Sequence, residues 1–115
     1  MKTVDLDVAG WEEVYPGVRR RTASAERMTL TLYRFDSGAA FPMHHHDQEQ
    51  LALVRRGAVE FHNARARITC RANELIIIPP NEPHGATAGP EGADVVSVVS
   101  PARRGVGDYT VEGSG

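Results

Sequence analysis

The residues of this chain with the clearest chemical potential are histidines. Three of the five are consecutive, His44, His45 and His46, and a fourth, His84, follows a proline-rich stretch. Alternate residues of an extended strand share a face, so His44 and His46 can point one way while His45 points the other. Gln50 is an even number of positions further on. Neutral imidazoles commonly bind first-row divalent metals, so these histidines with one oxygen ligand would form a metal site with open positions.

The histidine run has other interpretations. It could be a solvated surface loop or the remnant of a purification tag. The run is internal and short, which disfavours a tag, and a surface loop does not account for His84. Glu49 stays an alternative oxygen ligand if the chain bulges after His46. The residue types therefore favour a metal site over a surface cluster.

Short strands are the elements that must position these side chains. Residues 28–33 alternate between apolar and polar types, which predicts a half-buried strand. Four consecutive aliphatic residues within 74–78 predict a strand buried on both faces. Many short strands with glycine and proline turns predict an all-β sandwich or barrel. The other expected strands are 39–46, 50–55 (ended by Gly57), the hairpin of 58–61 and 65–70, and 93–100.

Length and composition predict one domain over 1–115, with a core at about 27–101 and a loose tail at 103–115. A net charge of -2 and short basic clusters, read as solvated faces, give no reason to expect a nucleic-acid partner. Cys70 is the single cysteine, so no internal disulfide is possible and a buried, inert thiol is expected. No leader and no membrane-spanning stretch are recognisable, so we expect a cytoplasmic protein without a membrane partner. One lysine among 13 basic residues is typical of a GC-rich bacterial genome.

The spacing around the histidines is also specific. The first set of residues is Gly38, His44, His46, Gln50 and Gly57, and the second set is Asn73, Pro79, Asn81 and His84. This pattern resembles the two sequence motifs of the cupin superfamily, from Gly38 to His84. The resemblance implies a single double-stranded β-barrel of the jelly-roll type, with His44, His46, Gln50 and His84 as metal ligands. Asn73 and Asn81 stand where cupins usually have glycine, and asparagine tolerates a left-handed turn better than other non-glycine residues.

Gln50 stands where most cupins have glutamate. Three imidazoles and an amide leave the charge of a divalent ion uncompensated, which makes the ion a stronger Lewis acid and a weaker stabiliser of oxidised iron. The sequence thus predicts one divalent transition metal (Ni, Zn, Fe, Mn or Co) and non-oxidative chemistry on a small polar molecule, such as isomerisation, ring opening, cyclisation or elimination. The alternatives are a cupin dioxygenase and a non-catalytic cupin that binds a metal or a small ligand.

Within the superfamily the chain most resembles the small cupins of pectin degradation, which open the ring of unsaturated uronates. Those relatives read Asp-Val-Phe-Ser-Pro in the last strand, where this chain has Ser97 and Val99 in place of the acid and the aromatic residue. A serine is not an ionised base at neutral pH, so the pocket is expected to suit another small molecule. Single-domain polyketide cyclases are the next comparison. The candidate catalytic residues are Glu49, Tyr33, Arg20 and Ser97.

A homodimer is also expected. Leu51 and Leu53 face away from Gln50 in the predicted strand. In a small barrel, an apolar outer face of this kind suits contact with a second copy of the chain.

Overall fold

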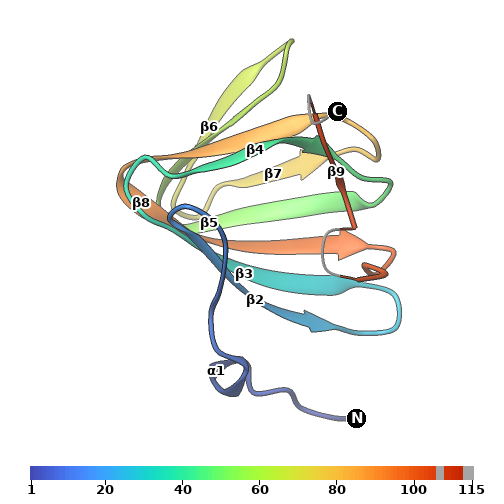
Figure 1. The fold of residues 1–115 in the computed structure, drawn as a ribbon. Coiled ribbons are helices and arrows are strands. Elements are labelled where there is room, and N and C mark those ends of the chain that lie inside the picture. Colours follow the sequence, from blue (N-terminus) through green and yellow to red (C-terminus); the bar gives the residue numbers. More distant parts are fainter. Residues whose placement is uncertain (106–107, 113–115) are drawn as a thin grey trace.

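The chain folds almost entirely into strands (Figure 1). The computed structural model describes residues 1–105 and 108–112, and within these it has nine strands and one short helix. No helix in these two ranges is long and apolar enough to cross a membrane. The elements are α1 (Leu6–Ala9), β1 (Glu12–Tyr15), β2 (Val18–Ser24), β3 (Thr29–Phe35), β4 (Ala40–His45), β5 (Glu49–His62), β6 (Arg67–Arg71), β7 (Leu75–Ile78), β8 (His84–Ser100) and β9 (Thr110–Val111).

The two longest strands, β5 and β8, run through both walls of the barrel. In one wall, the first part of β5 pairs with the last part of β8, for example Gln50 with Val99. That wall continues through β3, β2 and β1 on one side and through β7 on the other. In the other wall, Phe61 of β5 pairs with Ala86 of β8, and β4, β9 and β6 lie beside them. The predicted all-β barrel is confirmed.

Glycines allow the long strands to bend between the two walls. Gly57 in β5 and Gly92 in β8 both have a φ of 73°. A Cβ on Gly57 would clash with the carbonyl oxygen of Gly92, so the strands approach each other closely at this point. We expected Gly57 to end one strand and a new strand to begin at residue 93. Both strands instead continue through their glycines, because the chain turns there without losing its pairing partner.

The core fills the inside of the barrel. It includes Phe35, Phe41 and Val59, and the predicted burial of Cys70 is confirmed. The prediction that the strand at 74–78 is buried on both faces is wrong. Ile78 is only 2% exposed, but Ile77 is 60% exposed. Only one face of β7 covers the core, and its other face lies on the outside of the barrel.

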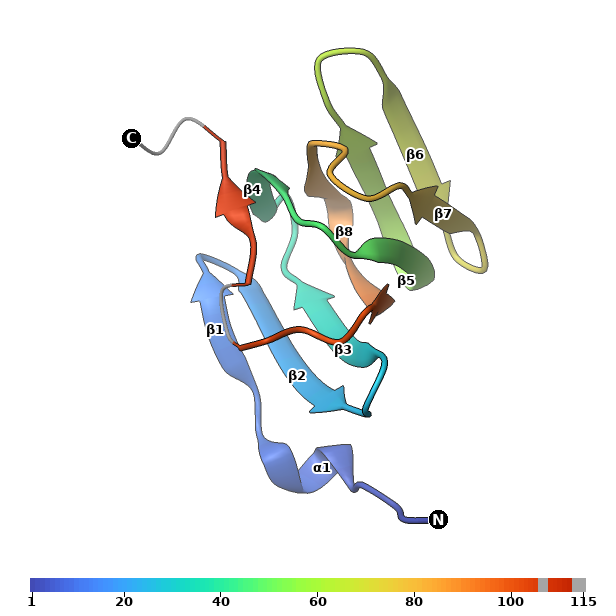
Figure 2. The same ribbon diagram turned by 90° about the vertical axis from the view of Figure 1, so that its right-hand side faces the viewer.

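The C-terminal segment differs from the expected loose tail. After β8 the chain crosses one end of the barrel before it reaches β9 (Figure 2). The Arg103 amide donates a hydrogen bond to the hydroxyl of Thr29 (2.9 Å), and the hydroxyls of Tyr109 and Tyr15 lie 2.9 Å apart. Strand β9 then pairs with β4. The described part of the tail is therefore fixed to the barrel, while 106–107 and 113–115 lie outside the described residues.

Candidate metal centre

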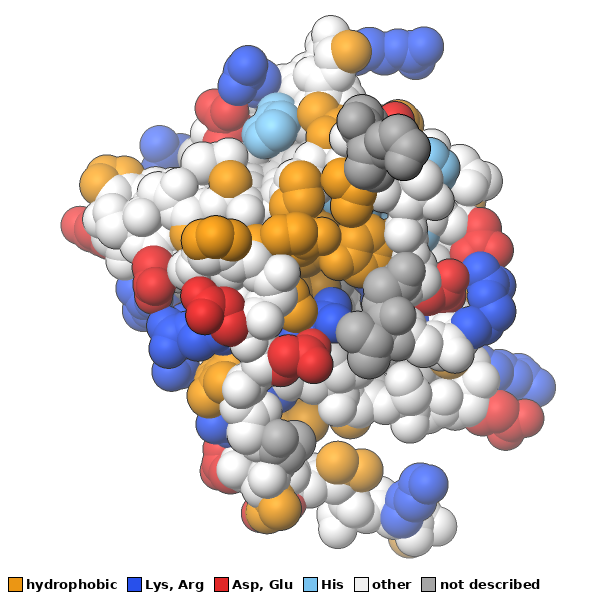
Figure 3. Space-filling view, in the orientation of Figure 1, with side chains coloured by type: hydrophobic (Ala, Val, Ile, Leu, Met, Phe, Trp, Pro, Cys, Tyr) orange, Lys and Arg blue, Asp and Glu red, His pale blue; other side chains and the backbone are white. Residues whose placement is uncertain are grey.

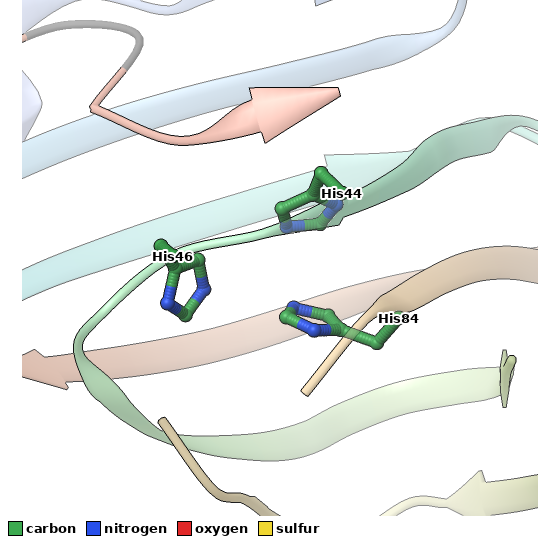
Figure 4. A group of neighbouring side chains, drawn as sticks. All are labelled: His44, His46 and His84. Carbon is green, nitrogen blue, oxygen red and sulfur yellow. The ribbon is translucent and has the colours of Figure 1, made fainter. Parts of the chain in front are cut away.

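Two adjacent strands of the barrel bring three histidines together (Figure 4). His44 lies near the end of β4, His46 follows that strand, and His84 begins β8 directly opposite His44 in the sheet. The alternation expected from the sequence holds, because His45 points outward and its Nδ1 lies 2.6 Å from a carboxylate oxygen of Glu112. Strand geometry thus separates two inward histidines from the one between them.

The three inward rings are buried and close together. His44, His46 and His84 are each no more than 6% exposed. One ring nitrogen from each lies within 4.8 Å of the other two. The ring centres of His44 and His84 are 4.2 Å apart. A single ion could therefore contact all three imidazoles.

Backbone carbonyl groups determine which nitrogen of each ring carries the proton. A carbonyl oxygen can only accept, so an Nδ1 atom beside it must be the protonated one, and Nε2 then keeps its lone pair. All three histidines have this arrangement, with a carbonyl two positions away along the chain. The bonds run from His44 to Pro42 (2.8 Å), from His46 to Gln48 (3.1 Å) and from His84 to Glu82 (2.9 Å).

The contacts of the Nε2 atoms fit a bound cation. Nε2 of His84 is buried and has no hydrogen-bond partner within the described residues. Nε2 of His46 lies 3.0 Å from the amide oxygen of Gln50, whose amide nitrogen donates to the Ser97 hydroxyl (3.1 Å). In this orientation two lone pairs face each other, which a cation would stabilise. The donor set of three imidazoles and one amide oxygen therefore fits a first-row divalent metal.

Burial keeps these imidazoles neutral. It lowers the pKa of His44 to about 3, with the neighbouring His84 adding to the effect. It also lowers the pKa of His84 to about 4 and that of His46 below its usual range. Metal ions bind the unprotonated ring, so the site stays ready to bind at neutral pH and below.

A cavity of about 40 Å³ lies beside the histidines, on the inside of the barrel. Tyr33 and Ser97, two of the expected catalytic residues, line it. Burial raises the pKa of the Tyr33 hydroxyl against the opposing effect of nearby arginines, so this group stays protonated at neutral pH. Arg20, another expected catalytic residue, does not line this cavity but lines a neighbouring one. Glu49 is exposed on the opposite face of β5 from Gln50, so the structure does not bring it to the site.

Arg103 also lines the cavity, and sequence reasoning missed it. Arg103 and Arg104 form one of the short basic clusters, most of which we interpreted from the sequence as solvated faces. Arg104 is exposed and bonds to the carboxylates of Asp47 and Asp108, but Arg103 is half-buried and extends over the ring of Tyr109. Nothing in the sequence distinguishes the two arginines. Only the path of the chain across the end of the barrel does.

Comparison with known proteins agrees with this fold. The model of the AraC-like ligand binding domain family matches residues 29–112, so the chain belongs to that family. The search of curated proteins found no match. The structural neighbours below share this fold and include an RmlC-like cupin, so the expected jelly-roll barrel of a small cupin is confirmed.

Three solved structures show the extent of the likeness. KdgF from Halomonas sp. is 26% identical, with a TM-score of 0.78 over 85% of this chain and 91% of that chain. An RmlC-like cupin from Shewanella frigidimarina is 24% identical, with a TM-score of 0.78 over 85% of this chain and 88% of that chain. The polyketide cyclase RemF from Streptomyces resistomycificus is 23% identical, with a TM-score of 0.77 over 97% of this chain and 85% of that chain.

Proposed function

We propose that this cupin is a metal-dependent enzyme that acts on a small polar molecule by Lewis-acid, non-oxidative chemistry. The observation that carries the proposal is the convergence of three buried imidazoles, with one ring nitrogen of each within 4.8 Å of the other two, beside one amide oxygen. His44, His46, His84 and Gln50 would hold one divalent ion of nickel, zinc, iron, manganese or cobalt. Such an ion polarises a carbonyl or hydroxyl group and lowers the pKa of bound water.

Residues of the cavity wall would bind and protonate the substrate. Arg103 is a fixed positive charge beside the histidines, and it would orient an oxygen-bearing group of the substrate. Tyr33 stays protonated, so its hydroxyl can donate a proton or a hydrogen bond to an oxygen that becomes negative. Ser97 accepts the hydrogen bond that fixes the amide of Gln50, so its role is to position that ligand.

The relatives suggest the type of reaction. KdgF and RemF are similar over most of their length, and RemF is a polyketide cyclase. The resemblance to pectin-degradation cupins favours ring opening or isomerisation of a sugar-like acid. Ser97 replaces the acid of those relatives, so the proton must come from another group, for which Tyr33 is the candidate. Isomerisation, ring opening, cyclisation and elimination share a polarised oxygen and a transferred proton.

A panel of uronates and cyclisable diketones, incubated with protein loaded with each metal, tests this proposal. We expect turnover without oxygen consumption, lost in His46→Ala and slowed in Tyr33→Phe. A protein that binds these compounds but leaves them unchanged would support the alternative of a ligand-binding domain. The family match is the observation that supports this alternative, because the family is described as a ligand binding domain.

The dioxygenase alternative is tested at Gln50. A carboxylate stabilises oxidised iron and an amide does so less well. In the iron-loaded protein, Gln50→Glu should therefore lower the reduction potential. Rapid, stoichiometric oxygen uptake by the wild type with flavonols, diketones, thiols or uronates would contradict the non-oxidative proposal.

We also infer that the protein forms a homodimer through the outer face of one wall. Cross-strand pairs place aliphatic side chains next to one another over four adjacent strands, β7, β5, β8 and β3. Three of them, Leu51, Leu75 and Ile77, are between 40% and 60% exposed. The outer apolar face consists of Ile77, Leu51, Val98 and Leu30 in one row and Leu75, Leu53, Val96 and Leu32 in the next.

A further inference from the structure

The cavity beside the histidines is too small for a substrate. Its volume of about 40 Å³ leaves room for little more than water, whereas ligand pockets usually measure about 300–1,000 Å³. A second cavity of about 350 Å³ adjoins it and shares one wall residue, Arg103. It lies between β1, β2, the start of β3 and the chain after β8. The larger part of a bound molecule would therefore lie in this second cavity.

A row of polar side chains connects the two cavities across adjacent strands. Gln50 bonds to Ser97, Ser97 is opposite Thr31 in the sheet, and Thr31 is opposite Thr22. The hydroxyls of Thr22 and Thr31 are 3.5 Å apart. Ser97 lines the first cavity, while Thr22 and Thr31 line the second. A molecule with several hydroxyl or carbonyl groups could bind along this row.

The second cavity contains a buried positive charge. The side chain of Arg20 is 8% exposed, and its Nε donates to a carboxylate oxygen of Glu12 (2.9 Å). Glu12 itself is 58% exposed, so water weakens this pair. A guanidinium offers several N–H donors in a fixed fork that matches an oxyanion, and one carboxylate oxygen uses few of them.

Arg103 adds a second positive charge at the boundary between the cavities. Among the described residues no carboxylate lies within ion-pair distance of Arg103, and one terminal nitrogen donates to the backbone oxygen of Asp108 (3.1 Å). Glu12 is the acidic residue that lines the second cavity. Arg21 is a third arginine of the wall and pairs with Asp7 (2.9 Å). Arginines thus outweigh the one acid that lines the cavity, and hydroxyl groups complete its wall.

We propose that this second cavity binds an oxyanion, a carboxylate or a phosphate group, through Arg20, Arg103 and the threonine hydroxyls. In the absence of ligand, Glu12 would pair with Arg20, and the anion would displace the Glu12 carboxylate. The anion would be part of the molecule that reacts at the histidines. This part of the proposal rests on the function proposed above. The oxyanion site itself does not depend on a metal, so it can be tested separately.

The test is calorimetric titration of the full chain, freed of metal with a neutral chelator, in a low-salt buffer without phosphate. Inorganic phosphate and glucuronate are titrated in parallel. We expect one of them to bind with a dissociation constant of about 1 mM, and the tighter of the two identifies the kind of oxyanion. Arg20→Gln should weaken binding by about tenfold or more, because it removes charge-assisted hydrogen bonds.

Two further variants keep the test decisive if Arg20→Gln folds poorly. Arg19→Gln changes the neighbouring arginine on the opposite face of β2, where it pairs with Asp36, and should leave binding unchanged. Glu12→Gln removes the competing carboxylate and should tighten binding by about threefold or more. A purely structural role of the Arg20–Glu12 pair predicts no such gain. The proposal is overturned if neither anion binds below about 20 mM, or if Glu12→Gln weakens binding. Anion binding by a wild-type protein that takes up no divalent metal would contradict only the metal-dependent function.

Discussion

Each of the three inward histidines is oriented by a main-chain carbonyl. The Nδ1 atoms bond to the backbone, and one ring nitrogen of each histidine lies within 4.8 Å of the other two. The rings are buried, and a rotation that exchanged their nitrogens would break these hydrogen bonds, so rotation is disfavoured. The metal-binding form of the site is thus preorganised before an ion arrives.

The first prediction compares inward and outward histidines. His46→Ala and His84→Ala should weaken binding of a divalent metal by more than about 100-fold, because each removes a ligand. His45→Ala should leave binding within about threefold of the wild type, since this ring bonds to Glu112 outside the cavity. Calorimetric titration of the three variants decides the matter. An equal loss in His45→Ala would show that the site uses the other face of the strand.

The second prediction concerns the stability of the metal-free protein against pH. The ordinary histidine pKa of 6.5 applies to the unfolded chain, whereas the folded values are about 3 for His44 and about 4 for His84. Between the folded and the unfolded pKa values, the unfolded chain binds more protons than the folded protein does. The free energy of unfolding therefore rises with pH in this range. The stabilisation is complete above pH 6.5 and is lost as the pH falls toward 4 and 3.

Urea denaturation of the metal-free protein measures this effect. The free energy of unfolding should fall by about 1 kcal/mol or more between about pH 7 and about pH 5. His84→Asn should reduce the pH dependence, because it removes one of the two groups with a strongly lowered pKa. An unchanged pH dependence in this variant would contradict the proposed cause.

At the level of the elements, turns fix the site as much as strands do. Asn73 has a φ of 72° and Asn81 a φ of 66°, so both left-handed turns expected from the cupin spacing are confirmed. The main-chain N–H of Asn81 donates a hydrogen bond to the main-chain carbonyl oxygen of His46 (2.8 Å). This turn therefore connects the strand that carries His84 to the segment that carries His46.

The third prediction follows from that turn. Asn81→Val should lower the free energy of unfolding by about 1–2 kcal/mol, because a β-branched residue strongly disfavours a positive φ. Asn81→Gly keeps the turn and should change stability by less than about 0.5 kcal/mol. Chemical denaturation of both variants provides the comparison. Equal effects would mean that the left-handed backbone at residue 81 is not what stabilises the turn.

The sequence predicted the parts of the fold in which local rules agree. Alternation identified β3 and the inward histidines, and regular spacing identified the turns at Asn73 and Asn81. Local rules failed where tertiary contacts decide the outcome. Gly57 continues a strand because β8 pairs with it across the bend, and Arg103 reaches the cavity because its chain segment crosses the barrel. Neither contact can be predicted from the residue types next to Gly57 or Arg103 in the sequence.

The fourth prediction applies to the whole molecule. Leu51→Glu places a charge in the centre of the outer apolar face and should convert a dimer into a monomer, because burying an unpaired charge is unfavourable. Ile68→Glu is the matched control, since Ile68 is also exposed (49%) but lies on β6, outside this face. Sedimentation equilibrium measures both variants. A monomeric wild type, or dissociation by Ile68→Glu alone, would contradict the proposed interface.

A hydrophobic area is visible on the face of the molecule that Figure 3 shows, with charged side chains near its edge. Aromatic contacts join Phe41 to Tyr15, to Tyr109 and to the ring of His44. The hydrogen bond between Tyr15 and Tyr109 links the first strand to the segment before β9. Tyr15 and Tyr109 thus pack against Phe41, which contacts His44 and lines the cavity.

Elemental analysis tests most directly whether this barrel holds a metal ion. The protein should be purified without a tag or a nickel resin, and the metal-free form then supplied with manganese, iron, cobalt, nickel or zinc. We predict about one first-row divalent ion per chain, either as isolated or after this addition. Less than about a tenth of an equivalent in the isolated protein, with no uptake of any of the five metals, would contradict the claim.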